Sequence, residues 1–285
     1  MNKINLHFTD VCNYSCTYCF AKKENKCLSE SDLRIVVDHA KEYFVRNNIS
    51  NPAINLAGGE IFTYNKLDEL IDYISSQDID CSIITNGYNL DDKFLEQNQG
   101  KISQIGISID SLNDDTNIKI GRCLKNKKLL TYNDYLSLCK KIIKYGYQLK
   151  INICVSNLNC QETNLFKKFL DNFRDESLRI KVMRMVVVDN RNPHSIKYKL
   201  SNEEFDNFVE ELSDYNVEIE NEEIMFTKYL MINSDGDVVV HNECGTDLII
   251  GNAISDSYAL DRAVDKVHQV RKLFNIKTIR GCLNV

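Results

Sequence analysis

The chain has 285 residues, of which 43% are hydrophobic, and its formal net charge at pH 7 is −6. This size and hydrophobic content suit one large or two small globular domains, and the negative charge argues against binding to nucleic acid or to an anionic membrane surface. No apolar run approaches the roughly 20 residues of a membrane span, and the first residues lack the apolar segment of a signal peptide. The 11 cysteines are unevenly spaced and odd in number, which is not typical of a secreted disulfide framework. We therefore expect a cytoplasmic protein with no nucleic-acid partner and no membrane partner.

Short apolar runs alternate with amphipathic stretches along residues 1–200. The apolar runs predict strands buried on both faces, and the stretches with hydrophobic residues at helical spacing predict helices. In chain order, strands are expected at 3–8, 53–57, 81–85, 105–109, 149–155 and 178–188, and helices at 31–47, 67–74, around Phe94, 132–146 and 162–173. This alternation is typical of a parallel α/β barrel or part of one. We expect residues 1–200 to form a partial (β/α)6 barrel.

After residue 200 the alternation loosens. Three features are expected there: a helix at 201–212, a hairpin of strands 228–233 and 238–241, and a last helix at 258–274. Ser201 is a good N-cap for the first of these helices, because Glu204 can close a capping box. No Pro-rich linker precedes this segment. We therefore expect residues 201–285 to cap the barrel.

Three cysteines, Cys12, Cys16 and Cys19, follow the first expected strand with the spacing C-x3-C-x2-C. Three thiolates can hold a [4Fe–4S] cluster and leave one iron without a protein ligand, whereas structural zinc and ordinary clusters have four protein ligands. The next cysteine, Cys27, lies outside any standard ligand spacing. The alternative is three unrelated cysteines, which are common core residues.

Other motifs also follow expected strands directly, namely Gly58-Gly59-Glu60, Thr85-Asn86-Gly87 and residues 108–111. In parallel α/β barrels the chemistry lies at the carboxyl ends of the strands, so these motifs and the cysteines are expected to meet in one site. Glycines allow close approach of a backbone to a ligand, and a carboxylate accepts hydrogen bonds from an ammonium group or a ribose. Taken singly, each of these motifs is more typical of an ordinary turn.

The cysteine motif resembles the signature of the radical S-adenosylmethionine (SAM) superfamily, in which SAM binds the fourth iron. Further motifs, in the same order, are similar to those of the viperin family: residues 7–20, 54–60, 108–111, 117–122 and 150–152. The resemblance covers about residues 5 to 181 and, more weakly, the region of Tyr229. Ala53, Ala57 and Ile180 stand where the family pattern has a lysine, a serine and an aromatic residue. The resemblance implies a radical SAM barrel whose C-terminal extension, 201–285, contributes to a nucleotide site.

The resemblance also implies a role for particular residues. The cluster would be held by Cys12, Cys16 and Cys19; SAM would be bound by Tyr18, Phe20, Gly58, Gly59, Glu60, Asn86, Ser108 and Arg122; and the nucleotide would be bound by Asn5, His7, Asn55, Lys150, Asn152, Arg179, Lys181 and Tyr229. Tyr18 is expected near the adenine of SAM, and the motif ending at Glu60 is expected at its amino group. Tyr229 is the expected catalytic residue, as a donor of a proton or a hydrogen bond.

The implied activity is the conversion of a ribonucleoside triphosphate (CTP, GTP or UTP) to its 3′-deoxy-3′,4′-didehydro analogue, a chain terminator in antiviral defence. The implied cofactors are a [4Fe–4S] cluster and SAM, with an electron donor such as flavodoxin or ferredoxin. A 5′-deoxyadenosyl radical would remove the 4′-hydrogen of the ribose. The 3′-hydroxyl would then leave as water with addition of an electron and a proton.

Two pairs of polar residues independently favour an anionic substrate. Lys150 and Asn152, and likewise Arg179 and Lys181, are two apart on expected strands, so each pair faces one side of the sheet. These pairs interrupt apolar runs, where an inward charge is costly without an anionic partner. We expect the cations to converge inside the barrel with no acidic residue to neutralise them, and a triphosphate would be their partner. The alternative is an outer face on which Lys and Arg are simply solvated.

Two other functions stay open at this stage. A radical SAM enzyme acting on a peptide or another small molecule would be favoured if the basic residues pointed outward. A non-enzymatic metal-binding module built on the three cysteines would bind zinc in place of a cluster.

Overall fold

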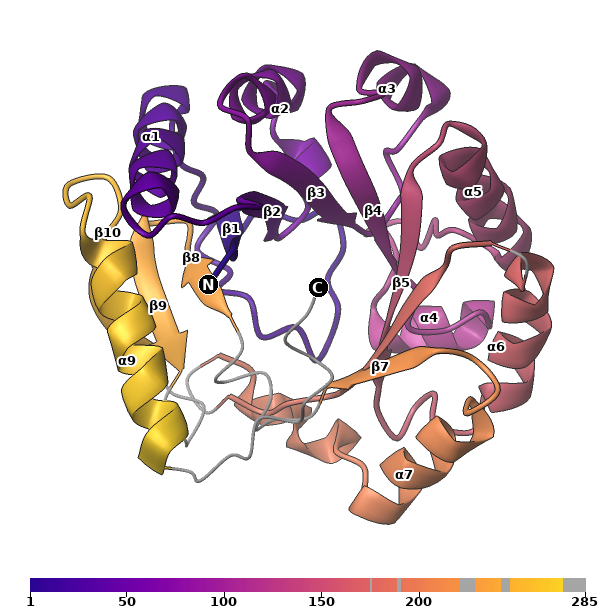
Figure 1. Ribbon diagram of the computed structural model, residues 1–285. Helices are drawn as coiled ribbons and strands as arrows, with labels where there is room; N and C mark the ends of the chain where they lie inside the picture. Colours follow the sequence, from indigo (N-terminus) through magenta and orange to yellow (C-terminus); the bar gives the residue numbers. More distant parts are fainter. Residues whose placement is uncertain (175, 189–190, 221–228, 242–246, 274–285) are drawn as a thin grey trace.

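The computed structural model describes residues 1–174, 176–188, 191–220, 229–241 and 247–273. Its strands form one ten-stranded sheet in the order β10-β9-β8-β1-β2-β3-β4-β5-β6-β7. They are β1 (Lys3–Thr9), β2 (Ala53–Gly58), β3 (Asp80–Thr85), β4 (Ile102–Ser108), β5 (Gln148–Val155), β6 (Arg179–Arg184), β7 (Val217–Glu220), β8 (Leu230–Ile232), β9 (Asp237–His241) and β10 (Asp247–Asn252). Strands β1 to β7 are parallel to their neighbours, β8 is parallel to β1, and β9 and β10 are antiparallel. The sheet curves strongly but stays open, since β7 and β10 lie at its two edges (Figure 1). The expected partial α/β barrel is confirmed.

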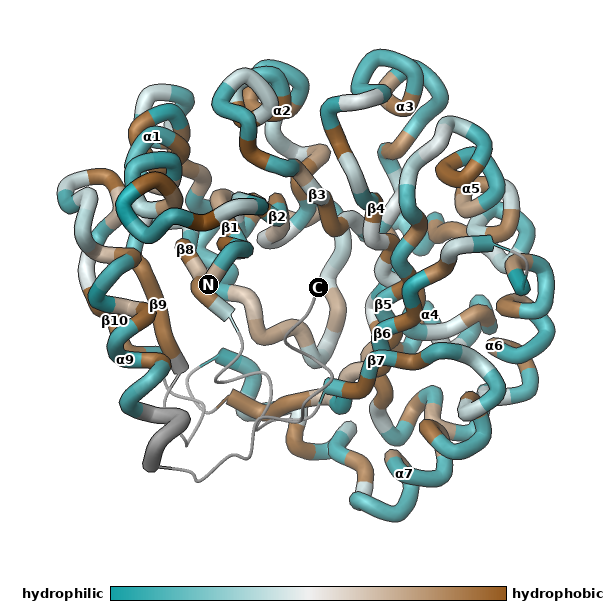
Figure 2. The backbone as a smooth tube through the Cα atoms, in the orientation of Figure 1, coloured by the Kyte–Doolittle hydropathy of each residue, from teal (hydrophilic) through white to brown (hydrophobic). Residues whose placement is uncertain are grey.

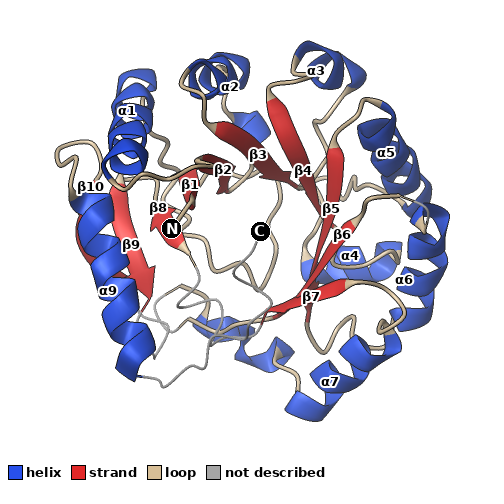
Figure 3. Ribbon diagram, viewed as in Figure 1, coloured by secondary structure: helices blue, strands red, loops and turns tan. Residues whose placement is uncertain are grey.

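Helices surround the curved sheet on its outer side (Figure 3). They are α1 (Glu30–Arg46), α2 (Leu67–Ser76), α3 (Asp92–Gln97), α4 (Asp114–Ile120), α5 (Tyr132–Lys144), α6 (Thr163–Leu170), α7 (Asn202–Glu211) and α9 (Ala259–Leu273), with 3-10 turns η1 (Ile61–Thr63), η2 (Asp171–Phe173) and η3 (Pro193–Tyr198). The outer sides of many helices are hydrophilic, and brown hydrophobic segments lie toward the sheet (Figure 2). No helix in the described ranges has both the length and the apolar composition needed to cross a membrane.

Alternation along each strand separates the core from the inner face of the sheet, by which we mean the face that points away from the helices. On β1, the side chains of Ile4, Leu6 and Phe8 are buried in the main core cluster. Their neighbours Asn5 and His7 therefore point to the inner face. The same alternation on β2 to β6 places polar side chains, among them Asn55, Ser82, Gln104 and Asn152, on the inner face, opposite an apolar core.

Most of the elements expected from the sequence are present, with boundaries shifted by a few residues. Ser201 caps α7, and Glu204 completes the capping box as predicted. The predicted hairpin is β8 with β9, and its first expected residue, Lys228, lies outside the described residues, as does Phe274 at the end of the last helix. Strands β7 and β10 and helix α4 were not among the expected elements. Residues 201–285, which we call the tail, therefore supply strands to both edges of the sheet. The expected role of the tail as a cap stays a prediction.

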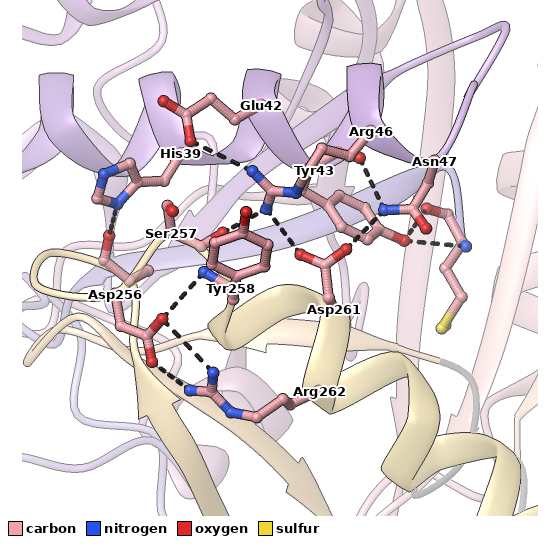
Figure 4. A network of polar contacts seen from close by, with 12 residues as sticks. His39, Glu42, Tyr43, Arg46, Asn47, Asp256, Ser257, Tyr258, Asp261 and Arg262 are labelled. Carbon is pink, nitrogen blue, oxygen red and sulfur yellow. Dashed lines mark hydrogen bonds and ion pairs between the residues drawn. The ribbon is translucent and has the colours of Figure 1, made fainter.

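Helix α9 lies beside α1 and joins the C-terminal part of the chain to the N-terminal part (Figure 4). The Arg46 guanidinium donates to the Asp261 carboxylate at 2.7 Å and lies 4.3 Å from the centroid of the Tyr258 ring. Asn47 donates to the other Asp261 oxygen at 2.8 Å, and a ring nitrogen of His39 lies 2.7 Å from the Ala253 carbonyl oxygen. These contacts fix the α9 end of the chain against the first helix of the barrel.

Candidate functional site

The three cysteines lie on the loop that follows β1, which we call the cysteine loop (residues 10–20). Cys12 is exposed, Cys16 and Cys19 are partly exposed, and all three are free thiols. Burial raises the pKa of the Cys16 thiol to about 12, against the opposing effect of the Arg122 guanidinium. The Cys16 thiol therefore stays protonated at neutral pH unless a cation such as a metal favours the thiolate.

The carboxyl end of α4 holds the cysteine loop from one side. The backbone N–H groups of Ser15 and Thr17 donate to the carbonyl oxygens of Gly121 and Ile120, at 3.2 and 2.7 Å. Gly121 ends the helix with a φ of 80°, and a Cβ at this position would lie 2.5 Å from the Ser15 carbonyl oxygen. Only glycine allows both this backbone conformation and this close approach.

A buried ion pair lies beneath the cysteine loop. The Asp110 side chain accepts hydrogen bonds from Arg122 Nε at 2.8 Å, the Tyr18 hydroxyl at 3.0 Å and the Cys154 backbone N–H at 3.0 Å. Asp110 and Arg122 are 1% and 8% exposed. A buried charge needs such partners, so this network fixes Tyr18 between the second and third cysteines.

A segment after β6, residues 191–195, holds the same loop from the outside, and the sequence patterns did not indicate it. Asn192 Nδ2 donates to the Tyr18 and Val186 carbonyl oxygens at 2.9 and 3.0 Å, and its Oδ1 accepts from the Val188 N–H at 2.7 Å. The side chains of His194 and Ser195 contact the Thr17 carbonyl oxygen of the loop, and the Arg191 guanidinium donates to the Phe20 carbonyl oxygen. No local motif marks these contacts, since they depend on packing between distant segments.

The Gly58-Gly59-Glu60 motif packs directly against the start of the cysteine loop. A Cβ on Gly58 or Gly59 would lie 2.2 Å from the carbonyl oxygen of Thr9 or Val11, so both glycines make room for backbone. The Glu60 carboxylate is 1% exposed and accepts from Thr85 Oγ1 at 2.6 Å, the Asn86 N–H at 2.7 Å and the Phe62 N–H at 3.2 Å. Burial raises the pKa of Glu60, and these hydrogen bonds oppose that shift. Glu60 thus ties the end of β2 to the end of β3.

A second polar group lies on the inner face of β5, β6 and β7. Lys150 pairs in register with Arg179, and Asn152 with Lys181. The neighbouring Ile151, Ile153, Ile180 and Val182 lie in the helix-facing core, so these four polar side chains point inward. Asn152 is 3% exposed and its Nδ2 has no hydrogen-bond partner. A buried amide donor of this kind is expected to meet a ligand or water.

The expectation that no acidic residue neutralises these cations was wrong. Strand β7 was not foreseen, and it places Glu218 and Glu220 beside β6 on the same face. Arg179 pairs with Glu218 at 3.2 Å, and Lys181 pairs with Glu220. The sequence Val217–Glu220 is too short to predict a strand, and the cost of burying charge is here offset by carboxylates of the chain itself.

Lys150 is a buried cation on this face, and its surroundings lower its pKa. Burial lowers the pKa of Lys150 to about 7, and the positive charges of Lys181 and Arg179 act in the same direction, whereas Glu218 and Glu220 oppose it. The ammonium is therefore only partly charged at neutral pH. An anion bound here would favour its protonated form.

Tyr229, directly before β8, lies next to Lys181 although the two are 48 positions apart in the sequence. The Lys181 ammonium donates to the Tyr229 hydroxyl at 2.7 Å, and that hydroxyl donates to Glu220 at 2.7 Å. Burial and the nearby carboxylate raise the pKa of Tyr229, which keeps its hydroxyl protonated. The tail thus contributes a hydrogen-bonding phenol to the inner face.

Polar side chains continue along the inner face of β1 to β3. Asn55 Nδ2 donates to Asn5 Oδ1 at 2.8 Å, and Ser82 Oγ donates to Asn55 Oδ1 at 3.0 Å. His7 points to the same face by alternation along β1. The expected nucleotide residues therefore all lie on one face of one sheet.

The family model of the radical SAM superfamily matches residues 6–163, more than half of the chain. The match spans the cysteine loop and the strands β1 to β5. The chain belongs to the radical SAM superfamily.

Individual relatives narrow this assignment. This radical SAM chain is 32% identical, over 82% of its length, to an S-adenosylmethionine-dependent nucleotide dehydratase of Lacinutrix mariniflava, but spans only 49% of that protein. It is 31% identical over 82% of its length to a protein of the same name from Flammeovirga pacifica, of which it covers 80%. The chain therefore belongs to this viperin-like family within the superfamily, as the sequence motifs predicted.

Solved radical SAM structures share the fold. An anSMEcpe structure with bound AdoMet matches 95% of this chain and 83% of its own, with a TM-score of 0.71 and 16% identity. The Streptococcus suis SuiB structure bound to S-adenosylmethionine matches 91% of this chain and 64% of its own, with a TM-score of 0.68 and 18% identity.

The superfamily uses a [4Fe–4S] cluster and SAM, and the residues of the cysteine loop fit the cluster. Three free thiols on one loop are a suitable donor set, because each thiolate of such a cluster binds a different iron. Cys12, Cys16 and Cys19 would therefore hold the cluster of this radical SAM protein.

The expected SAM residues lie around that loop, and their contacts with SAM stay predictions. Asn86 Nδ2 donates to Asn13 Oδ1 at 2.7 Å, and Arg122 Nη1 lies 3.3 Å from the Ser108 carbonyl oxygen. The Asn13 Nδ2 atom is buried without a partner, an orphaned donor that a bound ligand could satisfy. Phe20 is partly exposed, and its carbonyl oxygen accepts a hydrogen bond from the Arg191 guanidinium.

Proposed function

We propose that this radical SAM protein is a nucleotide dehydratase that converts CTP, GTP or UTP to its 3′-deoxy-3′,4′-didehydro analogue. The observation that carries the proposal is the set of Lys150, Arg179, Lys181 and Tyr229 on the inner face of the sheet that also carries the cysteine loop. Relatives named as nucleotide dehydratases support the same reading. The product would act as a chain terminator in antiviral defence, in the cytoplasm.

The residues of the chain would bind and orient the nucleotide. Ammonium and guanidinium groups suit phosphate oxygens, and the Arg179 fork can bind two of them. The cluster and SAM, when bound, supply the radical that removes hydrogen from the ribose. The protein must then hold the ribose close to that site and exclude water from it.

Loss of the 3′-hydroxyl as water requires one electron and one proton. The electron would come from a reduced protein such as flavodoxin or ferredoxin. Burial and the nearby Glu220 keep the Tyr229 hydroxyl protonated. This hydroxyl donates to Glu220 in the structure, and turned toward the nucleotide it would be a suitable donor of a hydrogen bond or proton to the departing oxygen.

One experiment tests the proposal directly. The anaerobically reconstituted protein is incubated with SAM, dithionite and one of CTP, GTP, UTP or ATP, and the products are identified by mass spectrometry. We expect one nucleotide to yield a product lighter by one water and to stimulate formation of 5′-deoxyadenosine. The absence of stimulation by any nucleotide would contradict the proposal and favour a peptide or another small molecule as substrate.

A further inference from the structure

Glu220 lies at the centre of the inner-face contacts, and the function proposed above gives it no role beyond raising the pKa of Tyr229. Its carboxylate is 3% exposed, pairs with the Lys181 ammonium and accepts a hydrogen bond from the Tyr229 hydroxyl at 2.7 Å. The Lys181 ammonium also donates to that hydroxyl and lies 4.9 Å from the centroid of the tyrosine ring. The three side chains thus form a closed triangle in which each contacts the other two.

This triangle joins parts of the sheet that are far apart in strand order. Glu220 ends β7, which is an edge strand beside β6, whereas Tyr229 precedes β8, which lies on the far side of β1. A tyrosine hydroxyl has one proton to donate, and here it is directed at Glu220. The carboxylate therefore contributes to the orientation of both the hydroxyl and the ammonium.

We propose that Glu220 is a positioning residue of the nucleotide site, an inference that rests on the function proposed above. Its carboxylate holds Tyr229 and Lys181 in one arrangement before the nucleotide arrives. The same negative charge repels the phosphates that Lys181 attracts. Glu220 thus weakens nucleotide binding and raises turnover. Replacing a residue needed only for folding would instead weaken binding and lower turnover together.

The exchange Glu220→Gln separates these two effects. The amide has nearly the shape of the carboxylate but no charge, so we expect the nucleotide dissociation constant to fall by about 3- to 10-fold. Lys181 and Tyr229 both contact the same carboxylate oxygen, Oε2, and a neutral amide oxygen holds an ammonium and a hydroxyl less strongly than a charged one. We therefore expect turnover to fall by about 10-fold or more. The variant Glu220→Asp keeps the charge, so its turnover should lie between those of Glu220→Gln and the wild type.

Nucleotide binding is measured first, by anaerobic calorimetry with CTP, GTP and UTP on reconstituted protein without reductant. Turnover is then measured on reconstituted protein, as nucleotide-stimulated 5′-deoxyadenosine formation. Glu211→Gln is the matched control, because Glu211 is a surface residue paired with Lys167, outside the inner face. It removes the same charge and should keep both constants of the wild type.

A double-mutant comparison tests whether Glu220 acts through Tyr229. Tyr229→Phe removes the hydroxyl and leaves the ring, so it should lower turnover without tightening binding. If Glu220 acts by orienting that hydroxyl, the double variant should lose no more turnover than Tyr229→Phe alone. Additive losses, or a Glu220→Gln protein that binds and turns over like the wild type, would overturn the inference. If the wild type itself binds none of the three nucleotides, the proposed function fails first, and the inference with it.

Discussion

Buried acidic side chains illustrate how position decides the role of a residue type in this protein. Glu60, Asp110 and Glu220 are each at most 3% exposed, and each has different partners. Glu60 accepts from a hydroxyl and two backbone N–H groups, Asp110 pairs with Arg122, and Glu220 pairs with Lys181. A buried carboxylate without such partners would be strongly destabilising, so each pattern of partners shows what that residue holds in place.

The cysteines lead to a prediction about single residues. Replacing Cys12, Cys16 or Cys19 by alanine should abolish cluster binding and SAM cleavage, because each thiolate holds one iron. Iron content and 5′-deoxyadenosine yield after anaerobic reconstitution measure the effect. Cys27→Ala is the control and should keep the cluster, since this exposed thiol lies outside the motif. Normal iron content in any of the three loop variants would contradict the assignment.

Lys150 leads to a prediction about pH. With a pKa of about 7 it is charged below neutral pH and loses its charge as the pH rises. An anionic nucleotide favours the charged form of Lys150, so nucleotide affinity should fall as the pH rises from about 6 to 8.5. We expect this fall to be about 10- to 30-fold larger in the wild type than in the Lys150→Met variant. Calorimetry with UTP across this range checks the prediction. Parallel pH profiles of the wild type and the variant would show that Lys150 does not titrate with binding.

At the scale of elements, the cysteine loop is held by parts of the chain that are distant in sequence. The end of α4 binds its backbone from one side, and residues 191–195 bind its carbonyl oxygens from the other. The glycines at 58 and 59 bring the end of β2 against its start. Loops that carry function need such support, because a small displacement of a ligand is costly.

Asn192 provides the test of this support. It is fully buried and makes three hydrogen bonds, so Asn192→Ala should lose about 1–3 kcal/mol of local stability and release the loop around Tyr18. We expect lower iron content after reconstitution and faster cluster loss in air, followed by absorbance near 400 nm. Asn157→Ala removes an exposed asparagine that contacts the Lys197 carbonyl oxygen in the same region and should leave the cluster intact. Equal cluster retention in the two variants would speak against the role of Asn192.

At the scale of the whole molecule, the sheet is open, and side-chain contacts on both of its sides hold the C-terminal part of the chain in place. On the inner side, Tyr229 contacts Lys181 and Glu220. On the outer side, α9 is fixed to α1 through Arg46, Asn47 and Asp261 (Figure 4). An open sheet has no closing ladder of hydrogen bonds, and the Tyr229 contacts connect the start of β8 to side chains of β6 and β7 across the opening.

Arg46 tests the outer contact. Arg46→Ala removes a partly buried ion pair, a hydrogen bond to the Ser257 carbonyl oxygen and a cation–π contact. We expect the free energy of unfolding to fall by about 1–3 kcal/mol and the melting temperature by about 2–8 °C. Lys141→Ala breaks only an exposed pair with Asp92 and should shift the midpoint little. Thermal unfolding followed by circular dichroism compares them, and similar midpoints in the two variants would refute the importance of the α1–α9 contact.

Much of this protein could be predicted from the sequence because the signals are local. The three cysteines lie within eight residues, and buried strands and amphipathic helices are periodic over single elements. The capping box at Ser201 and the β8–β9 hairpin depend on neighbouring residues, and both are present. The inward direction of Lys150 and Lys181 follows from alternation along a strand.

Only the tertiary structure decided which side chains meet across the sheet. Glu218 and Glu220 carry no local signal, yet the position of β7 beside β6 brings them to the cations that the sequence left unneutralised. The contact of Tyr229 with Lys181 likewise joins residues 48 positions apart, and the hydrogen bond from Asn192 to Tyr18 of the cysteine loop joins residues 174 positions apart. Such contacts arise from the packing of whole elements, because burial of their apolar faces, and not the polar residues themselves, sets where each element lies.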